Sequence, residues 1–92
     1  MIKIKYSKRF KKDYKQVLKY DSAVQNDLKK MVDFLLSGKK LPDIYKNHKL
    51  KGEFKDCFEC HLRPNLLLIY KKEKSELIIL LLRIGSHSKL FG

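Results

Sequence analysis

The sequence lacks any long hydrophobic run. Its longest apolar stretch, Leu77 to Leu82, is far shorter than the roughly 20 residues that a membrane-spanning helix needs. The N-terminal residues alternate between apolar and polar side chains, as a strand does, and so do not form a signal peptide. We therefore expect a cytoplasmic protein without a membrane partner.

Cysteine is also scarce. Cys57 and Cys60 form a single C-x-x-C, and no second C-x-x-C completes a zinc-binding pattern. Their surroundings alternate like a strand, in which positions three apart face opposite sides. The sequence therefore predicts two reduced cysteines used in packing, no metal site and no cofactor.

Acidic residues are few: 10 Asp and Glu stand against 22 Lys and Arg, a formal net charge of +12. A field of this size favours nucleic acid, an anionic membrane or an acidic protein as partner. A generally lysine-rich composition is the alternative explanation. Only Arg9, Arg63 and Arg83 are arginines, whose planar guanidinium groups bind phosphate bidentately where lysine acts as a point charge.

The 92 residues suffice for one domain, residues 1–92. Residues 2–6 alternate like a strand, and Ser7 can cap the helix that follows. Two apolar stripes at helical spacing come next, and Gly38 ends the second in the usual left-handed position. The stripes are Phe10, Tyr14, Val17 and Leu18, then Val24, Leu28, Met31 and Leu35. Asp21 and Ser22 offer the second N-cap.

After a connector over residues 39–56, strands are predicted for residues 57–63, 66–72 and 77–84. Pro64-Asn65 forms a tight turn between the first two. The third is apolar on both faces, which indicates a central strand. The order β-α-α-β-β-β predicts an α+β fold in which two N-terminal helices cover one face of a small, mostly antiparallel sheet.

Three histidines lie in the second half of the chain, and histidine exchanges protons near neutral pH. His61 shares the polar face of its strand with Glu59 and Arg63. His87 follows the last strand, four residues after Arg83, and His48 lies in the connector. In a three-strand meander the end of the first strand and the end of the last can lie near each other, so one open site for all three histidines is geometrically allowed. The alternative is that they are surface histidines without a role.

Several motifs in the same order resemble the YafQ branch of the RelE/ParE toxin superfamily, over essentially the whole chain. They are Tyr45-Lys46-Asn47-His48-Lys49-Leu50-Lys51-Gly52, Glu59-Cys60-His61-Leu62-Arg63-Pro64-Asn65, Leu68-Ile69-Tyr70 and Arg83-Ile84-Gly85-Ser86-His87-Ser88-Lys89-Leu90-Phe91.

The resemblance implies a RelE-like fold and the toxin of a type II toxin–antitoxin pair, which cleaves mRNA on the ribosome and is blocked by a cognate antitoxin. It implies catalytic roles for His48, His61 and His87, with Arg83 near the phosphate and Phe91 near the substrate base. Family members commonly have an aspartate where this chain has Asn65. An amide cannot accept a proton, so Asn65 can position substrate but cannot be the base.

The resulting hypothesis is metal-independent attack by the RNA 2′-hydroxyl. His87 is the general acid, His48 or His61 is the base, and Arg83 stabilises charge in the transition state. Arg63 beside His61 would bind phosphate. The antitoxin should present an acidic surface. Two alternatives are a ParE-like toxin directed at DNA gyrase, which would lack this histidine set, and a basic nucleic-acid-binding module without activity.

Overall fold

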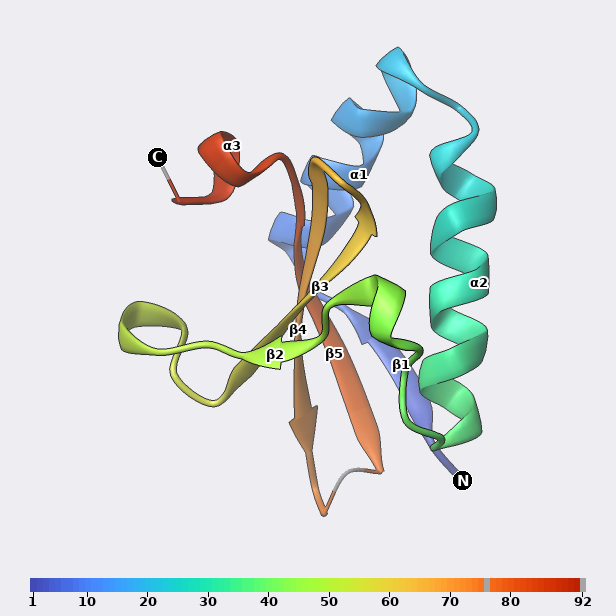
Figure 1. Ribbon diagram of the computed structural model, residues 1–92, viewed down its shortest axis with the longest axis vertical. Coiled ribbons are helices and arrows are strands. Elements are labelled where there is room, and N and C mark those ends of the chain that lie inside the picture. Colours follow the sequence, from blue (N-terminus) through green and yellow to red (C-terminus); the bar gives the residue numbers. More distant parts are fainter. Residues whose placement is uncertain (76, 92) are drawn as a thin grey trace.

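A five-stranded sheet with helices on both faces forms the core of the fold in the computed structural model, which describes residues 1–75 and 77–91 (Figure 1). The strand order is β1-β5-β4-β3-β2, with β1 parallel to β5 and the other pairs antiparallel. The predicted α+β fold is confirmed. The elements are β1 (Lys3–Tyr6), α1 (Lys8–Tyr20), α2 (Val24–Ser37), the 3-10 turn η1 (Asp43–Tyr45), β2 (His48–Lys49), the 3-10 turn η2 (Gly52–Phe54), β3 (Cys57–Arg63), β4 (Leu66–Glu73), β5 (Ile78–Gly85) and α3 (His87–Phe91).

Local chemistry determines where α1 begins and where α2 ends. The Ser7 hydroxyl accepts the Phe10 N–H at 2.9 Å, the predicted N-cap of α1. At the end of α2, Gly38 adopts a left-handed φ of 72°, which glycine tolerates without cost. The expected cap of α2 is displaced: Asp21 accepts the Ala23 N–H at 3.0 Å, and the helix begins only at Val24.

The apolar stripes of α1 and α2 pack on one face of the sheet and form the main core. Phe10 and Met31 are 1% and 0% exposed there, beside Leu68 and Leu81 at 0%. Burying a side chain of this size contributes about 1.5–3 kcal/mol, so this layer carries most of the fold's stability. Within the described residues, no helix combines the length and apolar content that crossing a bilayer requires.

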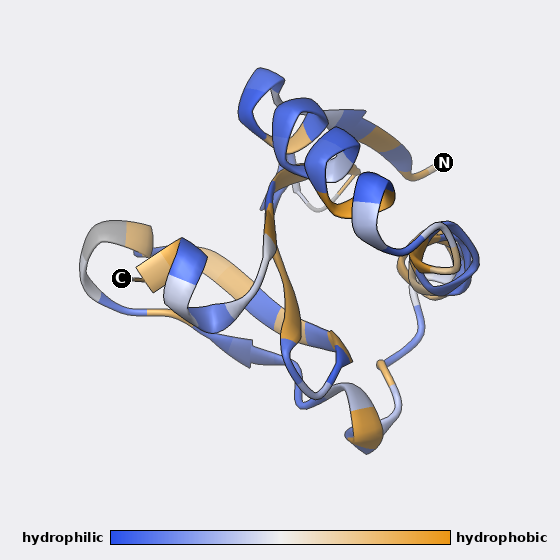
Figure 2. Cartoon of the chain, turned by 90° about the horizontal axis from the view of Figure 1, so that it is seen from above, coloured by the Kyte–Doolittle hydropathy of each residue, from blue (hydrophilic) through white to orange (hydrophobic). Residues whose placement is uncertain are grey.

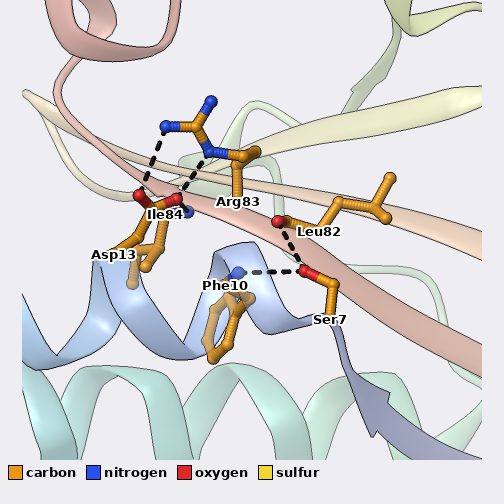
Figure 3. Close-up of polar contacts among 6 residues, drawn as sticks. All are labelled: Ser7, Phe10, Asp13, Leu82, Arg83 and Ile84. Carbon is orange, nitrogen blue, oxygen red and sulfur yellow. Dashed lines mark hydrogen bonds and ion pairs between the residues drawn. The ribbon is translucent and has the colours of Figure 1, made fainter.

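The start of α1 also covers the free edge of β5 (Figure 3). β1 pairs with β5 only as far as Leu81. Beyond it, the Ser7 hydroxyl donates to the Leu82 carbonyl at 2.9 Å, and the Asp13 carboxylate accepts the Ile84 N–H at 3.3 Å. Side chains of one helix thus replace the missing strand, which satisfies backbone groups that would otherwise be unpaired.

The opposite face of the sheet holds a small core, defined by Cys57, Leu67, Ile69 and Leu90. Seen from above, α3 lies on the side of the sheet away from α1 and α2 (Figure 2). Leu50, Phe54 and Leu82 pack against the same cluster. The sequence did not predict β2 or α3, because both are very short and depend on contacts with the sheet.

The two cysteines lie in different cores, as the strand alternation predicted. Cys60 is fully buried in the main core, with its sulfur 3.8 Å from that of Met31. Burial raises the pKa of its thiol to about 12. Cys57 lies in the small core, and burial raises the pKa of its thiol as well. Both are packing residues with poorly ionised thiols.

Candidate functional site

A buried carboxylate joins two of the three histidines on the open face of the sheet. Glu59 Oε1 lies 3.6 Å from His48 Nε2 and 3.3 Å from His61 Nε2. The Glu59 side chain is only 8% exposed, whereas those of His48 and His61 are 53% and 24% exposed. The carboxylate therefore sits beneath two imidazoles that solvent, and hence a substrate, can reach.

Strand geometry explains this grouping. Glu59 and His61 are two residues apart on β3, so both point to the face opposite Cys60. His48 is the direct cross-strand partner of Glu59 in the short β2–β3 ladder. Directly paired residues have Cβ atoms about 4.5–5.5 Å apart, which places the imidazole of His48 beside the carboxylate.

A backbone carbonyl fixes the ring of His48. Its Nδ1 lies 2.8 Å from the oxygen of Lys46. Because a carbonyl oxygen can only accept, Nδ1 carries the hydrogen, and in the neutral ring Nε2 is left with its lone pair. Nε2 is the nitrogen that faces Glu59, whose carboxylate can accept its hydrogen once the ring is protonated. Lys46 adopts a left-handed φ of 48° in this turn.

The segment before His48 is anchored to the main core. The Tyr70 hydroxyl donates a 2.7 Å hydrogen bond to Asn47 Oδ1, and the Tyr70 ring stacks on Phe58 at 5.5 Å. Burial raises the pKa of the Tyr70 hydroxyl, which keeps it protonated as a donor. This bond ties the two-residue strand β2 to the body of the sheet.

His87 belongs to a separate aromatic cluster. It is the first residue of α3, is exposed, and its ring lies 5.1 Å from that of Phe91. Phe91 in turn meets Phe54 edge-on at 5.6 Å and is 38% exposed. The predicted substrate-binding residue Phe91 therefore forms one cluster with the predicted acid.

The His87 cluster and the Glu59 pair share one face of the sheet. Leu90 of α3 packs on Leu67, which is the cross-strand partner of His61. Leu67 also pairs with Gly85, two residues before His87. Two strand spacings separate Gly85 from His61, roughly 10 Å. The structure thus joins His48 and His61 through Glu59 and places His87 on the same side in its own cluster.

Arg83 is held by an acidic residue that the sequence analysis did not single out. Its Nε and Nη2 donate to the Asp13 carboxylate at 2.6 and 3.2 Å, and Asp13 is only 5% exposed (Figure 3). Arg83 is the cross-strand partner of Ile69, but its guanidinium turns toward α1. Two of its donors are therefore already used inside the protein.

Arg63 does not share the face of His61, which corrects the prediction. The ladder shifts register between His61 and Arg63, and Arg63 pairs with Leu66 on the helix side. A β-bulge of this kind re-aims the following side chain. Arg63 donates to Asp27 at 2.5 Å and to Asp21. The hydrogen bond from Arg63 lowers the pKa of the Asp21 carboxyl.

Asn65 also lies away from the histidines. It is exposed in the β3–β4 turn and borders a shallow hollow with Tyr20 and Asp21 on the helix side. Of the predicted substrate-binding residues, Arg63 and Asn65 thus occupy the hairpin end of the sheet, whereas Phe91 belongs to the His87 cluster.

Glu59 and Asp13 are the functional candidates that sequence reasoning missed. A sequence pattern could have identified each of them. Glu59 stands two residues before His61 in an alternating strand, and Asp13 is the lone acidic residue in a lysine-rich helix. Within residues 1–75 and 77–91, no group of three or more His, Cys, Asp or Glu side chains is arranged to hold a metal ion.

Comparison with known proteins assigns the chain to a family. The family described as "Bacterial toxin of type II toxin-antitoxin system, YafQ" matches residues 2–92. The mRNA interferase toxin YafQ of Escherichia coli (strain K12) is 34% identical over 90 residues, which are 97% of this chain and 95% of the relative.

Solved structures agree over the full length. A chain of the E. coli DinJ–YafQ complex superposes with a TM-score of 0.87 and 33% identity, covering 100% of both chains. A metal-bound toxin from Helicobacter pylori superposes with a TM-score of 0.88 and 45% identity, covering 99% of this chain and 100% of that one.

Proposed function

The chain belongs to the YafQ family of type II toxin–antitoxin toxins, and from that premise we propose that it cleaves mRNA by histidine acid–base chemistry. The observation that carries the proposal is the contact of Glu59 Oε1 with both His48 Nε2 and His61 Nε2. Two solvent-accessible imidazoles over one buried carboxylate form a proton-accepting group.

RNA carries its own nucleophile, the 2′-hydroxyl, so the enzyme must remove one proton and supply another to the leaving 5′-oxygen. In our proposal either His48 or His61 removes the first proton, and Glu59, which contacts both, stabilises the imidazolium that forms. His87 on α3 donates the second proton. Its separation from the pair leaves room for a phosphate between base and acid.

Charge and base contacts complete the proposal. Among the contacts of the described residues, Arg83 uses Nε and Nη2 on Asp13, and we assign its remaining nitrogen, Nη1, to the phosphate. Phe91, 38% exposed, stacks on a substrate base, which is worth about 1–3 kcal/mol for an aromatic side chain. Asn65 positions the RNA further along, at the hairpin end of the sheet, where Asp21 and Asp27 hold Arg63.

The basic surface supports mRNA bound to the ribosome as the substrate, and hence the cytoplasm as the place of action. A net charge of +12 attracts ribosomal RNA as well as mRNA. A cognate antitoxin with an acidic contact surface neutralises the toxin. The similar E. coli chain was solved as a DinJ–YafQ complex.

The test is cleavage of a defined mRNA by purified protein, with and without ribosomes and with a chelator in parallel. We expect chelator-resistant cleavage that falls about 10²–10⁴-fold in each of His48→Ala, His61→Ala and His87→Ala. Gln16→Ala, exposed on α1, is the folded control that keeps full activity. Cleavage abolished by the chelator would contradict the metal-free mechanism, which matters because the similar H. pylori toxin is metal-bound.

Failure of wild-type protein to cut RNA in any format, together with poisoning of DNA gyrase, would replace the proposal with a ParE-like activity. A purified acidic antitoxin should suppress the cleavage stoichiometrically. Cleavage that continues at saturating antitoxin would mean that the antitoxin binds without blocking the active site.

A further inference from the structure

A groove of about 400 Å³ runs from His61 to the turn after α2. One wall is the end of β3 and its hairpin, with His61 and Pro64. The other consists of η1 and α2, with Ile44, Lys46 and Lys30. The volume lies within the roughly 300–1,000 Å³ typical of ligand sites.

The groove has apolar walls and a basic rim. Ile44 is 79% exposed, an unusual position for a large aliphatic side chain. Tyr45 behind it is half-buried and rests edge-on against Phe34 at 5.7 Å, which fixes this wall. Lys30 and Lys46 are both exposed at the rim. A flat apolar group with an attached anion fits such a groove.

The charge within the groove depends on these two lysines. Arg63 also lines it, but its guanidinium is shared between Asp27 and Asp21. Those ion pairs hold Arg63 in place, and the two carboxylates more than cancel its single positive charge. Lys30 and Lys46 are therefore the cations that an incoming phosphate would meet.

His61 links the groove to the proposed chemistry, because it lines the groove and also contacts Glu59. A strand of RNA whose cleaved phosphate lies at His61 must continue to one side of it. The groove is a continuous, positively rimmed path in that direction.

We propose that this groove binds the nucleotide next to the cleaved phosphate. The base lies against Ile44 and Pro64, and its phosphate contacts Lys30 and Lys46. The inference rests on the proposed RNA cleavage and adds the subsite that gives the enzyme a preference at a neighbouring base. Apolar contact with one base face supplies affinity, and the groove's fixed width supplies selection by size.

The test is NMR titration of labelled protein with an RNA trinucleotide whose 2′-hydroxyls are methylated, so that it cannot be cut. We expect amide shifts at residues 44–46 and 61–63. Ile44→Ser should weaken binding about 5- to 10-fold through lost apolar contact. Lys46→Ala should weaken it and lower the slope of log affinity against log salt by about one.

The β4–β5 hairpin at the opposite end of the sheet supplies matched controls. Leu77 is 51% exposed, so Leu77→Ser is the control for Ile44→Ser because it also removes an exposed aliphatic side chain. Lys74 is exposed, so Lys74→Ala is the control for Lys46→Ala. Both should bind the trinucleotide as the wild type does. In cleavage assays the two groove variants should raise KM more than they lower kcat.

Shifts confined to other surfaces, or unchanged affinity in both groove variants, would overturn the subsite. It would also be overturned if Ile44→Ser lost antitoxin binding but not trinucleotide binding, because the groove would then serve a protein partner. Failure of the proposed function looks different: His61→Ala would cut RNA like the wild type whatever the groove binds.

Discussion

The two faces of the sheet are built from the same strands but hold different kinds of side chain. The face under α1 and α2 is apolar and closed, with Leu68 and Leu81 fully buried. The other face has only the small core, and beside it Glu59 beneath His48 and His61. Since alternate residues of a strand point to opposite faces, one set of strands carries the main core on one side and the candidate catalytic side chains on the other. The comparison predicts which substitutions change activity and which change folding.

Glu59→Gln should give the largest effect, and on activity. The amide keeps the shape but cannot stabilise an imidazolium, so RNA cleavage should fall about 10²–10⁴-fold, equivalent to about 3–5 kcal/mol of activation free energy. Circular dichroism and thermal unfolding should change little. Glu73→Gln, a half-buried acid on β4, is the control. Full cleavage by Glu59→Gln would mean that the carboxylate on the open face takes no part in catalysis.

Asp13→Ala should give the largest effect on folding. It leaves the guanidinium of Arg83, 16% exposed, without its partner and the Ile84 N–H without an acceptor. Breaking a buried ion pair costs about 3–5 kcal/mol, measured as the free energy of unfolding in urea. Asp33→Ala, an exposed acid on α2, should cost almost nothing. Equal stabilities would mean that α1 is held to β5 by apolar contacts alone.

Leu68→Ala tests the closed face directly. Leu68 is 0% exposed in the main core, and truncating such a leucine costs about 2–5 kcal/mol. The unfolding midpoint in urea should fall, while the remaining folded protein should cleave RNA at a normal rate. Leu77→Ala, half-exposed at 51%, should shift the midpoint little. A selective loss of cleavage in folded Leu68→Ala would mean that the two faces are not independent.

The smallest effect concerns acid stability at the hairpin end. The hydrogen bond from Arg63 lowers the pKa of Asp21 below its ordinary value of 3.8. The charged form therefore stabilises the fold above that pH, and this stabilisation is lost as the pH falls through the lower, folded pKa. In Asp21→Asn the free energy of unfolding should therefore decline less steeply as the pH falls through this range. Urea unfolding at a series of pH values measures this decline. An unchanged profile would mean that the ion pair is too exposed to matter.

Sequence patterns predicted the closed face well, because periodic apolar residues determine which side of a helix or strand is buried. Phe10, Met31 and Cys60 all lie where their spacing placed them. The open face was harder to predict. The β-bulge after His61 is a property of strand pairing and cannot be read from alternation, so Arg63 was assigned to the wrong face.

The polar partners of Arg83 and Tyr70 could not be predicted from the sequence for a related reason. Asp13 lies 70 positions from Arg83, and Asn47 lies 23 from Tyr70, so neither pair has a local sequence pattern. The histidines were identified as candidates by their chemistry. Their division into a pair on Glu59 and a single residue on α3 depends on the strand register.

The parallel pairing of β1 with β5 has a consequence for the synthesis of this protein. Ser7 meets its backbone partner Leu82 only 75 positions later in the chain, so a growing polypeptide leaves its first strand unpaired until the last strand has emerged from the exit tunnel. Contacts between such distant residues also form slowly. We therefore expect nascent chains to lack the complete sheet, and the side-chain contacts that depend on it, until β5 has emerged from the ribosome.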